Sequence, residues 1–353
     1  MTASSRAIKF SRRPTRLLRL HLKRNPERLE TRRFPGVGSG PLALDSTDVV
    51  FGATGGVGAA VVTELLRRGG GVRAVSRHGH APKGAEGVAA DAADPADAAA
   101  VAEGAGVVYH CVSPDYTRWP ELLPPVSRSI LGAAESSGAK LVFADNLYAY
   151  GPVDGLLRED LPATASGPKG RTRVEVAAEM LGAHQKGLVR VTIGRASDYY
   201  GPGGTNSTAG ETVFGRVVAG KRPQWTGKLD VPHTFHYLPD IARGLVTLAE
   251  RPEADGEVWH LPAAEPLTAQ EFFDLVFDAA GRPTPAKAQI MGPSLLAVAG
   301  IFSPMLRELR ETAYQFRRPF VIDSSKFEDA FGRLEPTPHR DAVGRTVEWF
   351  RSR

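Results

Sequence analysis

The chain has 353 residues, of which 42% are hydrophobic and 24% are charged, and this composition is typical of a globular protein with ample core. Its one cysteine, Cys111, excludes an internal disulfide framework and a cysteine-based zinc cluster. No apolar run approaches the length of about 18 residues that a transmembrane helix needs, so we expect no membrane span and a cytoplasmic location.

The positive charge is concentrated at the N-terminus. Residues 1–33 contain eleven Lys or Arg and two acids, whereas the whole chain carries a formal charge of +5, so the remainder is mildly acidic. A nucleic-acid-binding surface on the folded part is therefore not expected. The basic segment could be a twin-arginine export signal, an arm that binds nucleic acid or an anionic membrane, or a disordered extension. We expect a disordered extension and linker over residues 1–46.

Short β-branched runs alternate with helical stretches from residue 48 onward. We predict strands at 48–53, 72–76, 107–112, 140–145 and 188–196, with helices at 56–69, 95–103, 119–137 and 171–186. This α/β alternation predicts a Rossmann-type, doubly wound parallel sheet.

The pattern loosens after residue 201. Helices at 210–219, 240–250, 268–280 and 293–313 and a strand at 257–262 predict a smaller C-terminal substrate lobe. We therefore expect a nucleotide-binding domain over 47–205, to which 235–262 return, and a substrate lobe made of 206–234 and 263–353.

The most informative segment is VVFGATGGVGAAVVTELLRRG, which begins at residue 49. Its glycines follow the spacing G-x-x-G-x-x-G between an apolar strand and an amphipathic helix. A tight turn needs positive φ, and a Cβ would keep a pyrophosphate away from the N–H groups at the helix start. The expected dinucleotide-binding residues of this loop are Gly52, Thr54, Gly55, Gly56, Val57 and Gly58.

The loop resembles that of the extended and atypical short-chain dehydrogenase/reductase superfamily, T-G-x-x-G-x-x-G, with Phe51 where threonine is usual. The resemblance is to the epimerase/dehydratase branch and covers residues 47–353. It implies that Asp91 holds the adenine amino group and that the backbone of Cys111, Val112 and Ser113 runs beneath the adenosine.

The cofactor preference can be predicted at the end of the second strand. An NAD site places an acid there for the ribose 2′-hydroxyl, whereas an NADP site places a cation. The sequence VRAVSRHGH offers no acid and has Arg77, so we expect NADP(H) rather than NAD(H).

The usual catalytic pair of the family, Tyr-x-x-x-Lys, is missing. None of the eight tyrosines has a lysine four residues later. The alignment on Glu175 places Arg171 at the lysine position. In LVFADNLYAYGP (141–152), Asn146 falls where the family has an active-site Ser or Thr, and Tyr148 is an additional phenol. We predict Tyr148, Asn146 and Arg171 as the catalytic group; the alternative for Tyr148 is packing against the neighbouring lobe.

Several further residues are expected to line the substrate cleft. Two histidines three residues apart, His233 and His236, make only a weak case for a metal, and we predict none. The predicted substrate-binding residues are Asp145, Arg195, Ser197, Tyr199, Tyr200, Trp225 and His233. We expect Asp198 to line the same cleft.

These observations predict an NADP(H)-dependent oxidoreductase that acts on a small organic carbonyl or enone with a non-standard acid–base group. One alternative is a non-catalytic NADP-binding regulator, and another is a redox-neutral lyase, cyclase or epimerase. The expected partner is a small-molecule substrate, with nucleic acid confined to the basic N-terminal arm, and the expected state is a monomer or homodimer.

Overall fold

The computed structural model describes residues 47–292 and 304–353. The predicted disordered extension over 1–46, and residues 293–303 of the helix predicted at 293–313, lie outside the described residues.

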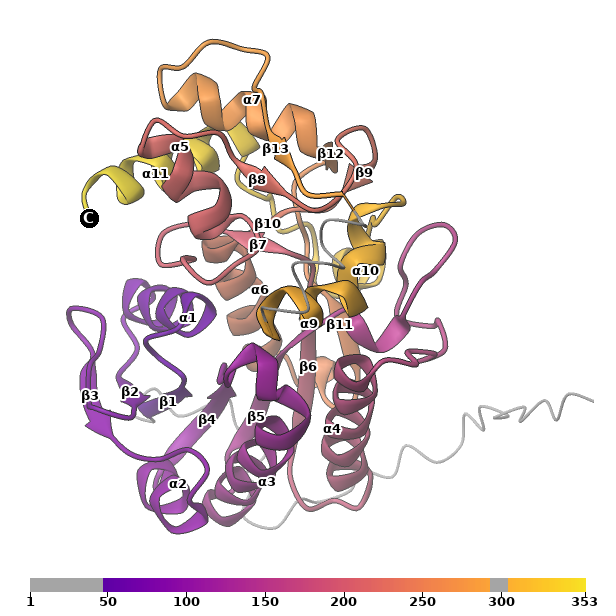
Figure 1. The fold of residues 1–353 in the computed structure, drawn as a ribbon. Coiled ribbons are helices and arrows are strands. Elements are labelled where there is room, and N and C mark those ends of the chain that lie inside the picture. Colours follow the sequence, from indigo (N-terminus) through magenta and orange to yellow (C-terminus); the bar gives the residue numbers. More distant parts are fainter. Residues whose placement is uncertain (1–46, 293–303) are drawn as a thin grey trace, which may run out of the picture. The chain divides into compact units, whose positions relative to one another are not determined.

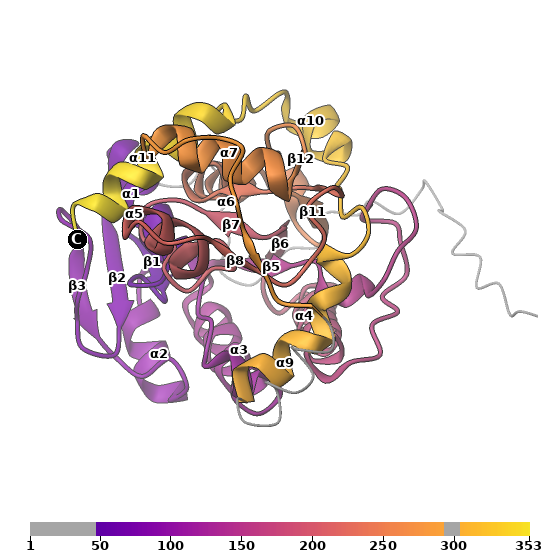
Figure 2. The ribbon, with the colours of Figure 1, turned by 45° about the horizontal axis from the view of Figure 1, so that its top comes forward.

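A seven-stranded parallel sheet forms the centre of the fold (Figure 1). Its strand order is β11-β6-β5-β4-β1-β2-β3, and Figure 2 shows the sheet running from β3 to β11. The change of direction at β1 and β4 is the topological switch point of a doubly wound sheet. The strands are β1 (Thr47–Phe51), β2 (Val72–Ser76), β3 (Glu86–Ala89), β4 (Ala105–His110), β5 (Lys140–Asn146), β6 (Val191–Ala196) and β11 (Val258–His260). The predicted Rossmann-type sheet is confirmed.

Helices cover both faces of this sheet, which explains why its strands are continuous apolar runs. One face packs against α1 (Gly56–Arg67) and α6 (Leu238–Glu250). The other packs against α2 (Pro95–Ala102), α3 (Trp119–Ser137) and α4 (Pro168–Gln185). Each face has its own hydrophobic cluster.

A third hydrophobic cluster lies in the part of the chain expected to form the substrate lobe. It is rich in aromatic side chains, among them Phe214, Phe272 and Phe350. The helices of this part are α5 (Arg216–Val218), α7 (Ala269–Ala279), α9 (Pro304–Thr312), α10 (Ser325–Phe331) and α11 (His339–Arg351). The short strands outside the central sheet are β7 (Tyr199–Tyr200), β8 (Gln224–Trp225), β9 (Pro232–His233), β10 (His236–Tyr237), β12 (Leu267–Thr268) and β13 (Gln289–Ile290), of which β7 and β10 fall in the ranges expected for the nucleotide-binding domain. The domain boundaries that we drew stay a prediction.

The helix expected at 210–219 has a different form. Residues Gly210–Gly215 make a π-helical turn that leads into α5. The helix expected at 268–280 is α7, which begins with a capping box in which Thr268 and Glu271 bond each other's backbone N–H groups.

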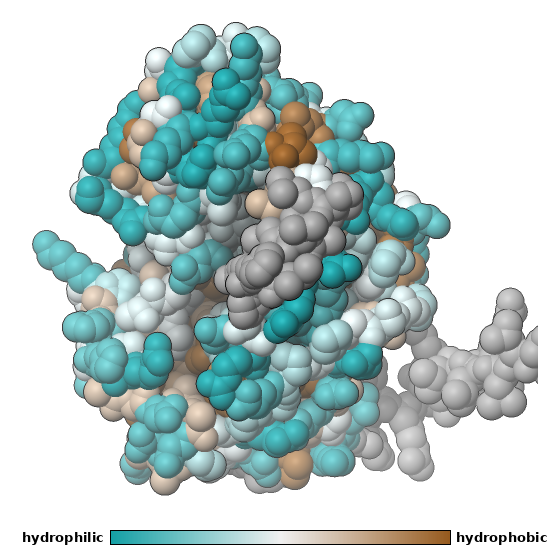
Figure 3. Space-filling view, viewed as in Figure 1, coloured by the Kyte–Doolittle hydropathy of each residue, from teal (hydrophilic) through white to brown (hydrophobic). Residues whose placement is uncertain are grey.

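The outer surface is mainly hydrophilic on the face shown in Figure 3. Among the described residues, the large hydrophobic side chains that are exposed are Leu156, Leu188 and Ile290. No helix within 47–292 and 304–353 has the length and apolar character needed to cross a membrane.

Candidate functional site

The glycine loop joins β1 to α1 in the conformation that its sequence predicts. Gly52 has φ +84°, and a Cβ there would lie 2.7 Å from the carbonyl oxygen of Cys111. A Cβ at Gly58 would overlap the carbonyl oxygen of Gly52. Glycine at position 52 lets the loop approach the end of β4, and glycine at position 58 lets the first turn of α1 pack closely on the loop.

The start of α1 is free to bind an anion. Its N-cap, Gly55, has no side chain to accept the first N–H groups, and the first turn contains no acid. Thr54 and Gly55 are exposed, and Gly56 and Val57 are half-buried. Backbone N–H groups and the positive end of the helix dipole therefore fit a pyrophosphate at this position.

We expect Gly58→Ala to abolish nucleotide binding. The added methyl group would meet the backbone of Gly52 and Ala53, which cannot rotate away as a side chain can. Overpacking of this kind costs about 1–3 kcal/mol of stability. The clash can be removed only if the phosphate loop moves, and such a movement would displace the backbone N–H groups that bind the pyrophosphate. Calorimetry with NADPH and urea unfolding check both effects. Gly132→Ala, where nothing lies within 4 Å of the added Cβ, is the matched control. Normal affinity in Gly58→Ala would contradict this role of the loop.

The segments beside the glycine loop lie where the prediction places the adenosine. Phe51 pairs with His110 in the parallel register, so Cys111, Val112 and Ser113 follow directly next to Gly52. Burial raises the pKa of the Cys111 thiol to about 12, and a thiol held protonated is unreactive. Backbone contact with the cofactor is therefore the role that fits this stretch.

The end of β2 carries a cation and no acid. Arg77 is exposed, and the Ser76 hydroxyl donates to the carbonyl oxygen of His80 at 2.8 Å. Asp91 is exposed, and its carboxylate accepts from the N–H of Ala93 at 3.0 Å. Arg77 and Asp91 are both accessible for the roles predicted for them.

At the end of β5, the side chains of Asp145 and Asn146 have defined structural partners. Asn146 Oδ1 accepts from the N–H of Tyr148 at 3.0 Å and so holds the backbone turn that carries this tyrosine. Asp145 was expected to contact substrate, but its buried carboxylate accepts from Arg173 Nη1 at 3.2 Å and from Arg195 Nε at 2.9 Å. Because both oxygens are engaged, Asp145 positions two arginines instead of facing a ligand.

Tyr148 belongs to a group of aromatic side chains. Its ring lies 5.9 Å from that of Trp119, which in turn lies 5.1 Å from that of Tyr116. Burial, followed by the neighbouring Tyr116 and the charge of Asp198, raises the pKa of Tyr148 well above its usual value. The phenol therefore stays protonated at neutral pH and can donate a hydrogen bond. Because a raised pKa weakens an acid, it can give up its proton only to an oxygen that is more basic still, such as an alkoxide.

Helix α4 presents different cations to the site than the sequence alignment suggested. Arg171 is exposed, and its guanidinium donates to the carbonyl oxygen of Ser166. Lys169 and Arg173, which lie one turn apart, are instead 0% and 4% exposed. The physical reason is helix geometry: positions 169 and 173 are four residues apart and share the inward face, whereas position 171 lies on the opposite side of the helix.

Sequence reasoning missed Lys169 and Arg173. The Gly-Pro pair at 167–168 is a helix-start signal that could have fixed the first helical residue three positions earlier than the predicted 171. Once both residues are inside the helix, their spacing of four residues places the two cations on one face.

The turn after β6 contains a histidine–carboxylate pair. His233 Nε2 lies 3.0 Å from Asp198 Oδ2, and Thr208 donates to Asp198 Oδ1 at 2.8 Å. His233 therefore has a carboxylate partner that the local sequence around it did not reveal. The imidazole of His236 is buried between the N–H of Ser197 and the carbonyl oxygen of Leu261. Within the described ranges no group of three or more potential ligands could hold a metal ion.

The other predicted substrate residues fall into two groups. Ser197 is buried and Tyr199 is half-buried. Tyr200 lies in the core, where its hydroxyl bonds His339 Nδ1 at 2.9 Å. Trp225 is also in the aromatic core, where its ring packs against Phe316 and Phe273 and its indole N–H donates to the Lys228 carbonyl oxygen. Tyr200 and Trp225 thus have packing partners that explain their burial.

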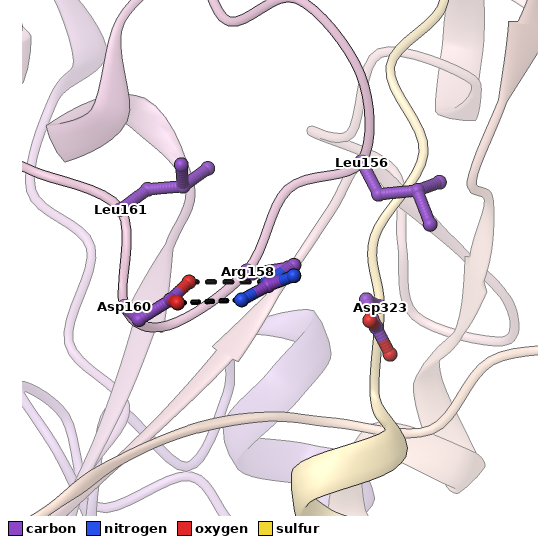
Figure 4. A pocket seen from close by; sticks show the side chains of 5 residues that line it. All are labelled: Leu156, Arg158, Asp160, Leu161 and Asp323. Carbon is purple, nitrogen blue, oxygen red and sulfur yellow. Dashed lines mark hydrogen bonds and ion pairs between the residues drawn. The ribbon is translucent and has the colours of Figure 1, made fainter.

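A hollow on the surface lies apart from these residues. It is lined by Leu156, Arg158, Asp160, Leu161 and Asp323 (Figure 4). Arg158 pairs with Asp160 inside it. None of its residues belongs to the glycine loop or to the polar cluster after β5, so we do not place the functional site there.

The fold and the loop together define a pyridine-nucleotide-binding Rossmann protein. The model of the NAD dependent epimerase/dehydratase family matches residues 49–261, and the chain belongs to this family. The family is one of enzymes, and the predicted resemblance to extended short-chain dehydrogenase/reductases is confirmed.

Solved structures show the same fold. A dTDP-glucose 4,6-dehydratase from Streptomyces venezuelae, a double mutant with NAD bound, is 18% identical with a TM-score of 0.71, over 86% of this chain and 96% of that one. A UDP-glucuronic acid 4-epimerase from Bacillus cereus in complex with NAD is 17% identical with a TM-score of 0.70, over 87% and 99%. A UDP-glucose 4-epimerase from Thermotoga maritima is 18% identical with a TM-score of 0.72, over 87% and 99%. No curated protein sequence matches the chain.

Proposed function

We propose that the protein is an NADP(H)-dependent oxidoreductase that acts on a small organic carbonyl or enone, with Tyr148 as proton donor. The observation that carries the proposal is the position of a protonated phenol after β5. The carboxyl ends of β5 and β1 lie at the same edge of the parallel sheet, so Tyr148 and the glycine loop share that edge.

The chemistry divides between the nucleotide and the chain. A bound pyridine nucleotide supplies or accepts the hydride. Tyr148 Oη donates the proton to the substrate oxygen and is re-protonated from solvent, and Asn146 holds the backbone turn that aims the phenol. The glycine loop and the start of α1 hold the pyrophosphate.

The preference for NADP(H) rests on the chain's own residues. An acidic residue at the end of β2 would accept a hydrogen bond from the ribose 2′-hydroxyl of NAD and would repel the 2′-phosphate of NADP. The end of β2 has no such residue. Arg77 is exposed there and can donate two parallel hydrogen bonds to a phosphate. Two of the similar structures named above contain NAD, so the preference has to be measured on this protein.

We expect Arg77→Ala to weaken NADPH binding by about 10- to 100-fold while leaving NADH binding nearly unchanged. Hydrogen bonds to a charged group contribute about 1.5–3 kcal/mol, and only NADPH has the 2′-phosphate. Calorimetry with both nucleotides makes the comparison, and Lys83→Ala removes an exposed cation from the same connection as a control. If the wild type binds NADH as tightly as NADPH, the assignment fails.

A nucleotide-binding regulator is the second candidate. The observation that favours it is the ion pair between buried Lys169 and Glu308. Lys169 lies over the ring of Tyr116, so Glu308 brings an acidic side chain of the protein itself close to the aromatic side chains around Tyr148, where a substrate would otherwise bind. A regulator would bind NADPH without oxidising it in the presence of any carbonyl or enone. A redox-neutral lyase, cyclase or epimerase would convert its substrate without net consumption of nucleotide, and steady-state absorbance at 340 nm with product analysis separates the three.

A further inference from the structure

The first turns of α4 carry two buried cations that stack on aromatic rings. Lys169 Nζ lies 4.5 Å from the centroid of the Tyr116 ring, and the Arg173 guanidinium lies 4.3 Å from that of Trp119. The Tyr116 ring packs beside the Trp119 ring, and the Trp119 ring packs beside the Tyr148 ring. The two cations and the proposed proton donor therefore form one continuous cluster. We call Lys169 and Arg173, with the first N–H groups of α4, the cationic site.

The sheet supplies one carboxylate, Asp145, for the buried cations around the site. Asp145 is the only carboxylate paired directly with Arg173 and Arg195 among the described residues, so two buried guanidinium groups share it. Lys169 is paired with Glu308, which comes from α9. A buried charge without a counter-charge is costly, so the balance of the cluster depends on an acid brought from a distant segment.

A second acid from α9 occupies the start of α4. Glu311 Oε1 accepts from the N–H of Lys169 at 2.8 Å and from that of Gly170 at 3.2 Å. Gly167 makes room for this carboxylate, because a Cβ at that position would overlap Glu311. Figures 1 and 2 both show α9 beside the beginning of α4. The cationic site is therefore built to hold carboxylate oxygens, and α9 provides two of them.

One strong donor in the cluster still lacks an acceptor. Arg173 Nε is buried and has no hydrogen-bond partner within the described part of the chain. The Arg173 guanidinium lies close enough to Tyr148 for the two groups to interact electrostatically. Buried donors normally have partners, so an unpaired guanidinium N–H beside a proposed catalytic phenol indicates a place for a ligand oxygen.

We propose that the cationic site binds a carboxylate group of the substrate, and that Glu308 and Glu311 occupy this site when no substrate is present. The inference rests on the proposed function and narrows its substrate to an oxo-acid or an unsaturated acid. The substrate carboxylate takes the place of the α9 carboxylates at Lys169 and the start of α4. A substrate oxygen then accepts from Arg173 Nε within reach of the Tyr148 hydroxyl.

The test measures anion binding without nucleotide or turnover. Acetate is titrated at fixed pH and ionic strength into the wild type and into Glu308→Gln/Glu311→Gln, with the thermal midpoint and the ¹⁵N resonance of Arg173 Nε as readouts. Removal of the internal competitor should tighten acetate binding by about 10-fold or more, because a larger fraction of the protein offers a free site. Acetamide, the neutral isostere, should not bind.

Two further variants define the site. Lys169→Met in the Glu308→Gln/Glu311→Gln background should remove the gain in acetate affinity, because it removes the cation that binds the carboxylate. Glu121→Gln/Glu179→Gln, which neutralises two exposed glutamates that pair with surface arginines, should leave acetate binding at the wild-type level.

The inference is overturned if Glu308→Gln/Glu311→Gln shows no gain, if acetamide binds as well as acetate, or if inorganic phosphate binds more tightly than acetate. If Lys169→Met does not fold, the comparison between Glu308→Gln/Glu311→Gln and its surface control decides alone. If acetate binding gains in this test while the separate assay detects no NADPH oxidation with any carbonyl or enone, the proposed oxidoreductase is refuted and the anion site stands.

Discussion

Replacement of Tyr148 by phenylalanine is expected to lower turnover by about 10²-fold or more while NADPH affinity stays unchanged, because general acid catalysis contributes about 10²- to 10⁴-fold. The substitution removes the hydroxyl and keeps the ring that packs near Trp119. The raised pKa of Tyr148 keeps the donor form populated through the neutral and mildly basic range, so the activity of the wild type should not decline there through loss of this proton. Steady-state kinetics with the best carbonyl of a panel measure the effect.

The matched control for this substitution is Tyr109→Phe. Tyr109 lies in β4, is 1% exposed and belongs to the sheet core, so loss of its hydroxyl should not change turnover. Equal turnover in Tyr148→Phe and the wild type would leave the fold and the cofactor site intact but would remove Tyr148 as the proton donor.

The second large effect is expected at Asp145. Asp145→Ala should lower the free energy of unfolding by about 3–5 kcal/mol, because removal of one partner from a buried ion pair leaves the other charge uncompensated. Here two guanidinium groups, 4% and 6% exposed, would lose their shared carboxylate. A loss of this size is a large part of the 5–15 kcal/mol that typically stabilises a domain.

Urea unfolding measures this loss, and Asp160→Ala provides the comparison. Asp160 also pairs with an arginine, Arg158, but both side chains are more than half exposed. An exposed pair of this kind contributes about 0–1 kcal/mol, so Asp160→Ala should be nearly neutral. A loss below about 1 kcal/mol in Asp145→Ala would show that the two arginines do not depend on this carboxylate.

The glycine loop could be predicted from the sequence because its requirements are local. Positive φ at Gly52 and close approach at Gly58 depend on residues within one turn and on the neighbouring strand, and the spacing of the glycines carries that information. The order of strands and helices is similarly local, since each element has its own hydrophobic period.

The chemistry after β5 could be predicted only in part, because its partners come from distant segments. Asp198 and His233 are 35 residues apart in the chain, and Lys169 and Glu308 are 139 residues apart. No local pattern links these positions. The identification of Arg171 instead of Lys169 and Arg173 has a simpler cause: it came from the alignment on Glu175, which does not show which face of α4 packs against the core.

We propose that this protein transfers a hydride between a nicotinamide nucleotide and a carbonyl or enone. The most direct measurement is deuterium transfer from NADPH labelled at C4 to the products of a panel of carbonyl and enone compounds, analysed by mass spectrometry. We predict deuterium on the carbon that was the carbonyl carbon or the enone β-carbon, with one NADPH consumed for each labelled product. Tight binding of NADPH without transfer of deuterium to any compound of the panel would contradict the claim and would leave the nucleotide-binding regulator and the redox-neutral enzyme as the two candidates.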